Sequence, residues 1–263
     1  MVSERKFTIG AGLKMYLGHR ETIEWLHGVA EIAKNHPAVV EGVVDLFVLP
    51  GFTALFPAVQ MMAGTGVKVG AQDLFWEDRG AFTGEVSGTQ LAELGCSLVE
   101  VGHAERRRLF GETDYIVAAK MLAAFRNGLT PVLCIGEIEQ QDPELAADEC
   151  VRQLESALAS SREANLVGHI VVAYEPQWAI GAAQPADIDY IRLVVDRLLN
   201  TVATDRRLAG SFVIYGGSVG PGLLTRLDGV VDGLFIGRFS HDPEALRSVL
   251  DEAWAMRKFL PSQ

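Results

Sequence analysis

The stretch His169-Ile170-Val171-Val172-Ala173-Tyr174-Glu175-Pro176-Gln177-Trp178-Ala179-Ile180-Gly181 joins an apolar run to a single acidic residue. The apolar run, residues 169–173, predicts a buried strand, because strands of a parallel sheet that is covered on both faces are continuously apolar. Glu175 falls where this strand should stop, and Pro176 cannot donate the backbone hydrogen bond that regular pairing requires. A carboxylate at a strand end before a small-residue loop is typical of a catalytic base under a lid, although a solvated surface acid fits the same pattern.

Seven more apolar runs of this kind occur, and most precede a segment with apolar residues at helical spacing. Eight such units without a linker or low-complexity segment predict an α/β fold, a (β/α)₈ TIM barrel that forms one domain over residues 1–263. A doubly wound sheet is the alternative, but Gly10-Ala11-Gly12 matches its glycine-rich first loop poorly. The predicted strands are residues 7–11, 44–49, 67–71, 98–102, 130–135, 169–173, 212–215 and 233–236. The predicted helices are residues 21–34, 53–62, 114–127, 143–160, 188–202, 222–227 and 243–259.

Composition narrows the class of protein and its partners. The 263 residues are 49% apolar and carry a formal net charge of −11, which argues against nucleic acid or an anionic membrane as the main partner. The cysteines, Cys96, Cys134 and Cys150, lack C-x-x-C spacing and indicate reduced thiols. No long uncharged apolar run is present, and residues 1–6 do not have the pattern of a signal peptide. We therefore expect a cytoplasmic protein without a membrane span.

Three side chains that could act in catalysis follow predicted strands. In a barrel the carboxyl ends of all the strands lie at the same face, where active sites form. Lys14 follows the first strand and supplies a fixed cation for an anionic substrate or a polarised carbonyl. His103 follows the fourth strand, and a helix start there would disfavour the imidazolium form. Glu175 follows the sixth strand as the candidate base. We also expect Glu105 and Arg106 to pair and hold the turn after His103.

Glycine-rich segments follow the last two predicted strands. Gly216-Gly217-Ser218-Val219 and Gly237-Arg238-Phe239-Ser240 allow backbone N–H groups to approach an oxyanion closely. Loops at these positions form the usual phosphate site of this architecture. The six histidines have no metal-ligand spacing, and no serine nucleophile motif is present. The remaining chemistry is proton transfer beside a carbonyl of a small phosphorylated molecule, without metal or cofactor.

These residues lie in motifs that resemble those of triosephosphate isomerase over nearly the whole chain. The resemblance implies that Glu175 moves a proton between adjacent carbons, that neutral His103 acts on the two oxygens, and that Lys14 faces the substrate. These roles come from the family and not from the sequence pattern. The matching motifs are Leu13-Lys14-Met15, Gly70-Ala71-Gln72, Gly80-Ala81-Phe82-Thr83-Gly84-Glu85, Val101-Gly102-His103-Ala104-Glu105-Arg106-Arg107, Phe110-Gly111-Glu112, Cys134-Ile135-Gly136-Glu137, Ala173-Tyr174-Glu175-Pro176, Trp178-Ala179-Ile180-Gly181 and Tyr215-Gly216-Gly217-Ser218-Val219.

The resemblance also implies how the substrate and a second subunit bind. A lid over the site would exclude water, which in this family suppresses phosphate elimination. The loop Gly80 to Glu85 is similar to the one that reaches into the partner subunit, which implies a homodimer. Arg238 stands where the family has a glycine, and it either lies by the phosphate or points outward to an acid. The phosphate contacts implied are Gly181, Ser218, Gly217 and Gly237.

Departures from the family pattern bear on the substrate. Gly12 replaces an asparagine, which removes an amide donor and is expected to open volume near the carbonyl end. Ala104 replaces a serine, Asp73 an asparagine, and the lid tip, residues 182–185, lacks the usual threonine-glycine-lysine-threonine. The added space would suit a ketose phosphate with one more hydroxymethyl group. The expectation is conversion of L-erythrulose 1-phosphate to D-erythrulose 4-phosphate, as in a known branch of the family.

Other functions remain open at this point. Classical triosephosphate isomerase activity, from glyceraldehyde 3-phosphate to dihydroxyacetone phosphate, is the nearest alternative. A Schiff-base aldolase with Lys14 as nucleophile would use the same barrel. A barrel that only binds a ligand would explain Ala104 and the altered lid, but not the retention of Lys14, His103 and Glu175 together.

Overall fold

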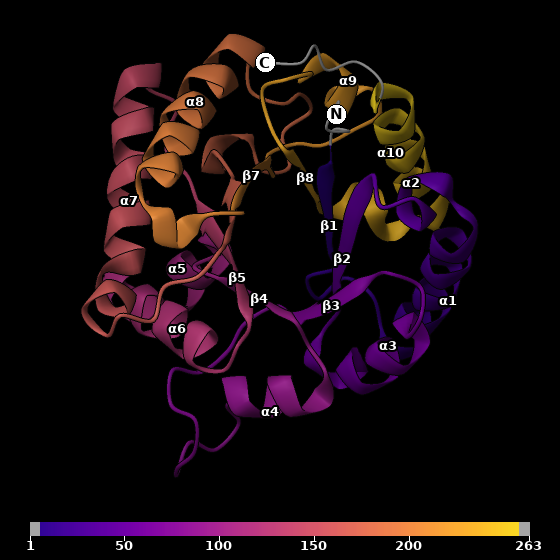
Figure 1. Cartoon of the computed structure of the whole chain (residues 1–263), viewed down its shortest axis with the longest axis horizontal. Helices are drawn as coiled ribbons and strands as arrows, with labels where there is room; N and C mark the ends of the chain where they lie inside the picture. Colours follow the sequence, from indigo (N-terminus) through magenta and orange to yellow (C-terminus); the bar gives the residue numbers. More distant parts are fainter. Residues whose placement is uncertain (1–5, 258–263) are drawn as a thin grey trace.

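The computed structural model describes residues 6–257, and the eight strands in that range close into a barrel. Each strand pairs in parallel with the next in the chain, and β8 closes the ring by pairing with β1. Figure 1 shows the strands at the centre of the molecule and the helices around them. The barrel prediction is confirmed, and the doubly wound sheet is excluded. The strands are β1 (Phe7–Gly12), β2 (Val44–Leu49), β3 (Lys68–Ala71), β4 (Leu98–Val101), β5 (Thr130–Ile135), β6 (Val171–Tyr174), β7 (Phe212–Tyr215) and β8 (Gly233–Ile236).

The helices cover the outside of the barrel with their apolar faces. Many begin at a polar residue whose side chain accepts a hydrogen bond from a free N–H of the first turn, as Asp187 does from Asp189. None of the helices within residues 6–257 is long and apolar enough to cross a membrane. The helices and 3₁₀ turns are α1 (His19–Asn35), α2 (Pro37–Val40), η1 (Phe52–Ala54), α3 (Leu55–Met62), α4 (Gly88–Leu94), α5 (Ala104–Phe110), α6 (Asp114–Arg126), α7 (Pro143–Glu163), η2 (Gln177–Ala179), α8 (Ile188–Thr204), η3 (Arg206–Leu208), α9 (Leu223–Arg226), η4 (Arg238–His241) and α10 (Pro243–Met256).

The predicted strands agree closely with the observed ones, with one informative shift. The sixth strand runs over Val171–Tyr174 and not over residues 169–173. The registered pairs begin at Val171, and the Ile170 N–H donates to the Ser211 hydroxyl oxygen at 2.9 Å instead of to a neighbouring strand. The shift places Glu175 immediately after the strand. The last helix ends at Met256, and the predicted residues 258–259 lie outside the described residues.

Two short helices, which follow β3 and β4, begin at capping residues and not at a repeat of apolar residues. Helix α4 begins at a capping box in which the Ser87 hydroxyl accepts from the Gln90 N–H, and the Gln90 side chain accepts from the Ser87 N–H. Helix α5 begins directly after His103, as the sequence suggested, and ends at Gly111, whose φ of 71° is left-handed.

The barrel interior is filled by side chains from alternate strand positions, since successive residues of a strand point to opposite faces. The rings of Phe47 and Phe235 stack there with centroids 5.9 Å apart. Glu100 is two residues after Leu98 on β4 and therefore shares its inward face. The apolar members of this layer are Phe47, Leu49, Leu98, Val132, Cys134, Val171, Ala173, Ile214 and Phe235.

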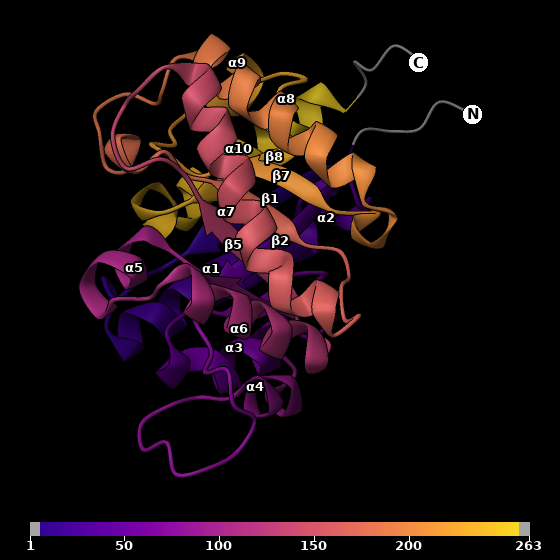
Figure 2. The ribbon, with the colours of Figure 1, turned by 90° about the vertical axis from the view of Figure 1, so that its left-hand side faces the viewer.

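The segment between β3 and α4 stands away from the barrel. Figure 2 shows this loop extending below α4, beyond the rest of the ribbon. It contains the stretch Gly80 to Glu85, and its Phe82 ring packs on Phe75 at a centroid distance of 4.6 Å. The Phe82 side chain still exposes 42% of its surface. The loop is thus an internally packed projection with an apolar residue near its tip.

Candidate active site

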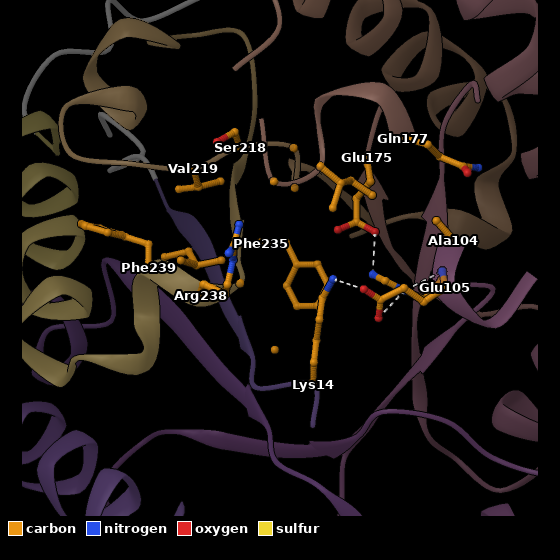
Figure 3. A pocket seen from close by; sticks show the side chains of 18 of the residues that line it. Lys14, Ala104, Glu105, Glu175, Gln177, Ser218, Val219, Phe235, Arg238 and Phe239 are labelled. Carbon is orange, nitrogen blue, oxygen red and sulfur yellow. Dashed lines mark hydrogen bonds and ion pairs between the residues drawn. The ribbon is translucent and has the colours of Figure 1, made fainter. Parts of the chain in front are cut away.

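One cavity of about 630 Å³ opens at the carboxyl ends of the strands. Every residue that the sequence assigned to chemistry or substrate binding lines it, so the structure brings the whole predicted set together. Figure 3 shows the side chains of many of the lining residues. Their roles in catalysis and binding remain predictions. The predicted residues in the lining are Gly12, Lys14, His103, Glu175, Gly181, Gly217, Ser218, Gly237 and Arg238.

Lys14 is held in an unusual backbone conformation just after β1. Its φ of 49° is left-handed, which is costly for a residue with a side chain and is typical of functional sites. The Gln72 amide supports this turn by donating to the carbonyl oxygens of Lys14 and Leu49, at 3.0 and 2.9 Å. The Lys14 ammonium donates to Glu105 Oε1 at 2.8 Å, and the two side chains point toward one another in Figure 3. Burial disfavours the charge, but Glu105 outweighs it and raises the pKa of Lys14.

Glu105 therefore has a different partner from the one expected. It pairs with Lys14 across the barrel mouth and does not pair with Arg106. Arg106 reaches the other way, to Asp73 Oδ2 at 2.9 Å and Glu112 Oε1 at 2.5 Å. The expectation of a Glu105–Arg106 pair was wrong because neighbouring residues of a helix point in different directions.

His103 caps helix α5 with its ring. Nδ1 accepts a hydrogen bond from the Glu105 N–H at 3.1 Å, so this nitrogen carries no proton. The neutral ring then carries its proton on Nε2, which faces the Glu175 carboxylate at 3.6 Å. At this separation the two groups do not hydrogen-bond to one another. Nε2–H is therefore available to a molecule in the cavity.

Glu175 is a buried carboxylate at the end of β6. No donor within residues 6–257 hydrogen-bonds to its Oε2. Burial raises the pKa of Glu175, against the opposing effect of His103 and Lys14. Gly216 lies directly against the carboxylate, since a Cβ there would come within 2.8 Å of Oε1.

The lid that follows Glu175 is tied to the end of β7 by hydrogen bonds on both sides of its tip. The Ser218 hydroxyl donates to the Ala182 carbonyl oxygen at 2.7 Å, and the Ala186 N–H donates to the Tyr215 hydroxyl at 3.1 Å. These bonds hold the lid over the cavity mouth, where its residues Ile180, Gly181 and Ala182 form part of the lining.

The start of the lid is anchored on a buried carboxylate that the sequence did not single out. The Trp178 indole donates to Glu137 Oε1 at 2.7 Å, and the Tyr190 hydroxyl donates to the same oxygen at 2.9 Å. The Tyr174 hydroxyl lies 3.3 Å from both oxygens of Glu137. A carboxylate with several donors fixes the start of the lid, whereas its tip is held by the Ser218 hydroxyl on Ala182.

The wall of the cavity next to the lid carries the glycine-rich strand ends. Gly237 precedes η4, and Gly217 and Ser218 follow β7. Arg238 has its guanidinium near the lid, since a Cβ on Gly181 would lie 3.3 Å from one of its nitrogens. In the part of the chain from residue 6 to residue 257, no acid forms an ion pair with Arg238. Of the two expected orientations, Arg238 therefore adopts the one in which it lines the cavity.

Gly12 does not leave the open space that the sequence suggested. A Cβ at this position would lie 3.1 Å from Cζ of Phe235, so the aromatic ring already takes much of the volume. Phe235 is buried and lines the cavity. The Phe235 ring on β8 therefore forms the cavity wall beside Gly12. The expectation of added volume was wrong in this respect, because Phe235, which fills the space, is far away in the sequence.

Asp73 belongs to a buried network and not to the cavity. The Lys120 ammonium donates to Asp73 Oδ1 and Glu112 Oε1 at 2.5 and 2.6 Å, and Arg106 joins from α5. Two carboxylates and two cations balance one another behind the turn that positions His103. Asp73, where the family has an asparagine, therefore supports the turn that positions His103 and does not contact the cavity.

Across residues 6–257, no cluster of histidine, cysteine or acidic residues could hold a metal ion.

A closed (β/α)₈ barrel with a carboxylate, an imidazole and an ammonium group around one cavity at the strand ends defines a barrel enzyme. The family model for triosephosphate isomerase matches residues 7–253. The chain therefore belongs to the triosephosphate isomerase family and is an isomerase.

The chain is similar to L-erythrulose-1-phosphate isomerases and to triosephosphate isomerases. It is 52% identical over 255 residues to the L-erythrulose-1-phosphate isomerase of Pectobacterium atrosepticum, covering 97% of this chain and 98% of that protein. The protein of the same name from Brucella abortus is 39% identical over 251 residues, with 93% and 95% coverage. The triosephosphate isomerase of Moorella thermoacetica is 37% identical over 241 residues, with 86% and 94% coverage.

Proposed function

We propose that this isomerase converts L-erythrulose 1-phosphate to D-erythrulose 4-phosphate. The observation that carries the reaction type is the position of Glu175 Oε2 and His103 Nε2, which face one another at 3.6 Å inside the cavity. A base and a hydrogen-bond donor at this spacing can act on a carbon and on the oxygen next to it. The 52% identity to a protein named for this substrate supports the four-carbon skeleton.

The reaction moves a carbonyl by one carbon. The Glu175 carboxylate removes the proton from C3, and the electron pair of that bond forms the C2–C3 double bond as the carbonyl oxygen gains negative charge. His103 Nε2–H and the Lys14 ammonium stabilise this enediolate. A proton passes between the two oxygens, and Glu175 returns its proton to C2. The product is the ketose with its carbonyl on the former C3.

The electrostatics of the site fit this sequence of steps. Burial raises the pKa of Glu175, which makes the carboxylate a stronger base than an exposed glutamate. Lys14 has a raised pKa and an ion pair with Glu105, so it remains a cation. A Schiff-base aldolase needs a neutral amine nucleophile. The observed pairing therefore favours isomerisation over that alternative.

The lid and the glycine-rich wall would hold the phosphate and exclude water. Gly181, Ser218, Gly217 and Gly237 surround the side of the cavity where their backbone groups can approach an oxyanion. Arg238 adds a cation on the same side. A closed lid protects the enediolate, whose phosphate would otherwise leave by elimination.

The experiment that tests the function follows the product directly. The purified protein is incubated in D₂O with L-erythrulose 1-phosphate and observed by ¹H and ¹³C NMR. We expect D-erythrulose 4-phosphate, with deuterium at the carbon that receives the proton. Absence of this product, with rapid turnover of glyceraldehyde 3-phosphate, would identify the classical activity instead.

A homodimer and a cytoplasmic location complete the proposal. The loop Gly80 to Glu85 projects from the barrel with Phe82 exposed, and Met15 beside Lys14 exposes 96% of its side chain. An apolar residue this exposed beside the site is explained if the loop of a second subunit covers it.

Cys96, Cys134 and Cys150 are buried and unpaired, which suits a reducing compartment.

A further inference from the structure

Glu100 is an acid in the otherwise apolar layer that fills the barrel. It lies on β4 and exposes 7% of its surface. Strand alternation places it on the same inward face as Leu98, in the layer that also contains Cys134, Ala173 and Phe235. A carboxyl group is rarely kept in such surroundings without a partner, because the loss of hydration is costly.

The protein itself gives Glu100 only a weak partner. The Cys134 thiol donates to its Oε1 at 3.5 Å, and a thiol is a poor donor. Lys14, whose charge acts on Glu100, is already paired with Glu105. No arginine or lysine in residues 6–257 forms an ion pair with Glu100. The proton transfer attributed to Glu175 and His103 does not use this group, so its presence needs another explanation.

The position of Glu100 in the cavity indicates what it could meet. It lines the same cavity as the candidate catalytic residues. In the closed barrel β4 lies across from β8, and the phosphate wall is built on the ends of β7 and β8. A substrate whose phosphate rests on that wall extends its other end toward β4. The group nearest Glu100 is then the end of the carbon chain that carries no phosphate.

We propose that the Glu100 carboxyl hydrogen-bonds to the hydroxyl of the terminal hydroxymethyl group and thereby selects a four-carbon substrate. This inference rests on the proposed function. A triose phosphate ends at the reacting carbon and has no fourth carbon with a hydroxyl group, so its binding would leave a buried carboxyl unpartnered. A site built to hydrogen-bond a hydroxyl group discriminates strongly against analogues that lack it. Gly12 and Phe235 would shape the neighbouring wall.

The protonation of Glu100 is compatible with this role. Burial raises the pKa of Glu100 to about 7, with Glu175 acting in the same direction and His103 opposing it. A carboxyl group that titrates in this range can accept a hydrogen bond from the hydroxyl or donate one to it. The contact can therefore form without the full cost of a buried charge.

The test is a cycle that removes the side chain and the substrate hydroxyl separately and together. The substrates are L-erythrulose 1-phosphate and its 4-deoxy analogue, and the enzymes are the wild type, Glu100→Leu and Glu100→Met. In the wild type we expect loss of the hydroxyl to lower kcat/KM by about 10- to 100-fold. In both variants the same loss should cost less than about threefold, because no polar partner remains.

A binding measurement shows whether the variants keep the rest of the site. The dissociation constant of 2-phosphoglycolate, which has a phosphate but no hydroxymethyl group, should change by less than about threefold. A methionine side chain is flexible and can fill an irregular gap in the core, so Glu100→Met replaces Glu100→Leu in the test if the leucine variant does not fold. Weaker binding of this ligand by more than about tenfold in a folded variant would indicate a general structural role and overturn the inference.

The outcomes separate this inference from the proposed function. If the wild type prefers the triose phosphate, the proposed function fails. If it prefers the four-carbon substrate but loses less than about threefold with the 4-deoxy analogue, only the Glu100 inference fails. The Glu100 inference also fails if loss of the hydroxyl lowers kcat/KM equally in the wild type and in Glu100→Leu. The wild-type measurement suffices even when neither variant folds.

Discussion

Glu175 illustrates how one residue acquires its reactivity from several others. Gly216 brings the backbone against it, and burial raises its pKa. His103 faces it with Nε2 but lies too far away to hydrogen-bond. The carboxylate is thus desolvated, and its Oε2 has no hydrogen-bond donor within residues 6–257, which suits a base that must take a proton from carbon.

Replacing Glu175 by glutamine should remove the base and keep the shape of the side chain. We expect kcat to fall by at least about 10³-fold with KM changed by less than about fivefold. Exchange of the substrate C–H proton with D₂O, followed by NMR, provides the measurement. Exchange at the wild-type rate in this variant would show that another group is the base.

The pair Gly12 and Phe235 should act as one specificity device. Gly12→Asn alone brings the new side chain against the Phe235 ring, so we expect at least about tenfold loss of kcat/KM on both three- and four-carbon substrates. Adding Phe235→Leu relieves the clash and should recover activity on glyceraldehyde 3-phosphate more than on L-erythrulose 1-phosphate. Phe235→Leu alone is the matched control. Equal recovery on both substrates would mean that this wall does not select between them.

At the scale of elements, the lid depends on contacts that are spread over three segments. Its start is fixed by Trp178 on Glu137, and its end by Ala186 on the Tyr215 hydroxyl. These partners lie on different strand ends and helices, so no local pattern in the lid sequence reveals them. The lid residues between these anchors carry the departures from the family.

Removing the Tyr215 hydroxyl should weaken lid closure and leave the barrel intact. In Tyr215→Phe the Ala186 N–H loses its partner, so we expect kcat to fall by about 5- to 100-fold. The share of substrate lost to phosphate elimination should rise at the same time, measured as inorganic phosphate released per turnover. Tyr115→Phe, at an exposed position on α6, is the control. Unchanged kcat and unchanged phosphate release would show that this bond does not govern the lid.

At the scale of the whole molecule, the repeated strand pattern was sufficient to predict the barrel. The meeting of Lys14, His103 and Glu175 in one cavity could be predicted as well, because each follows a strand and closure brings strand ends together. Glu100 and Phe235 could not, since their importance depends on which residues face inward and on contacts between distant strands. Glu100 nevertheless stood out in the sequence as an acidic residue inside a predicted buried strand. The Lys14–Glu105 pair likewise joins elements that the sequence does not relate.

The pH dependence of unfolding should report the burial of Glu100. Its folded-state pKa of about 7 exceeds the ordinary value, so its contribution to stability is fully present at low pH and is lost as the pH rises from about 4.5 to about 7. Relative to Glu100→Leu, the free energy of unfolding of the wild type should fall by about 3 kcal/mol across this interval. Urea unfolding of both proteins at several pH values measures it. Parallel curves would contradict a buried, titrating Glu100.

The proposed dimer should depend on the exposed methionine next to the site. Met15→Asp places a charge where the loop of a second subunit would pack, and we expect the variant to be monomeric at about 10 μM. Light scattering after size-exclusion chromatography measures the mass, and Met15→Leu is the control. A monomeric wild type would contradict the proposal, as would a Met15→Asp variant that still forms the wild-type dimer.

Above all, this barrel should isomerise a four-carbon ketose phosphate in preference to a triose phosphate. The decisive measurement is the ratio of kcat/KM for L-erythrulose 1-phosphate to that for glyceraldehyde 3-phosphate, obtained on one preparation. We predict a ratio of at least about 100, the size expected when a buried polar group gains or loses its partner. A ratio below one, with the triose phosphate turned over near the diffusional limit of about 10⁸ M⁻¹s⁻¹, would contradict this preference.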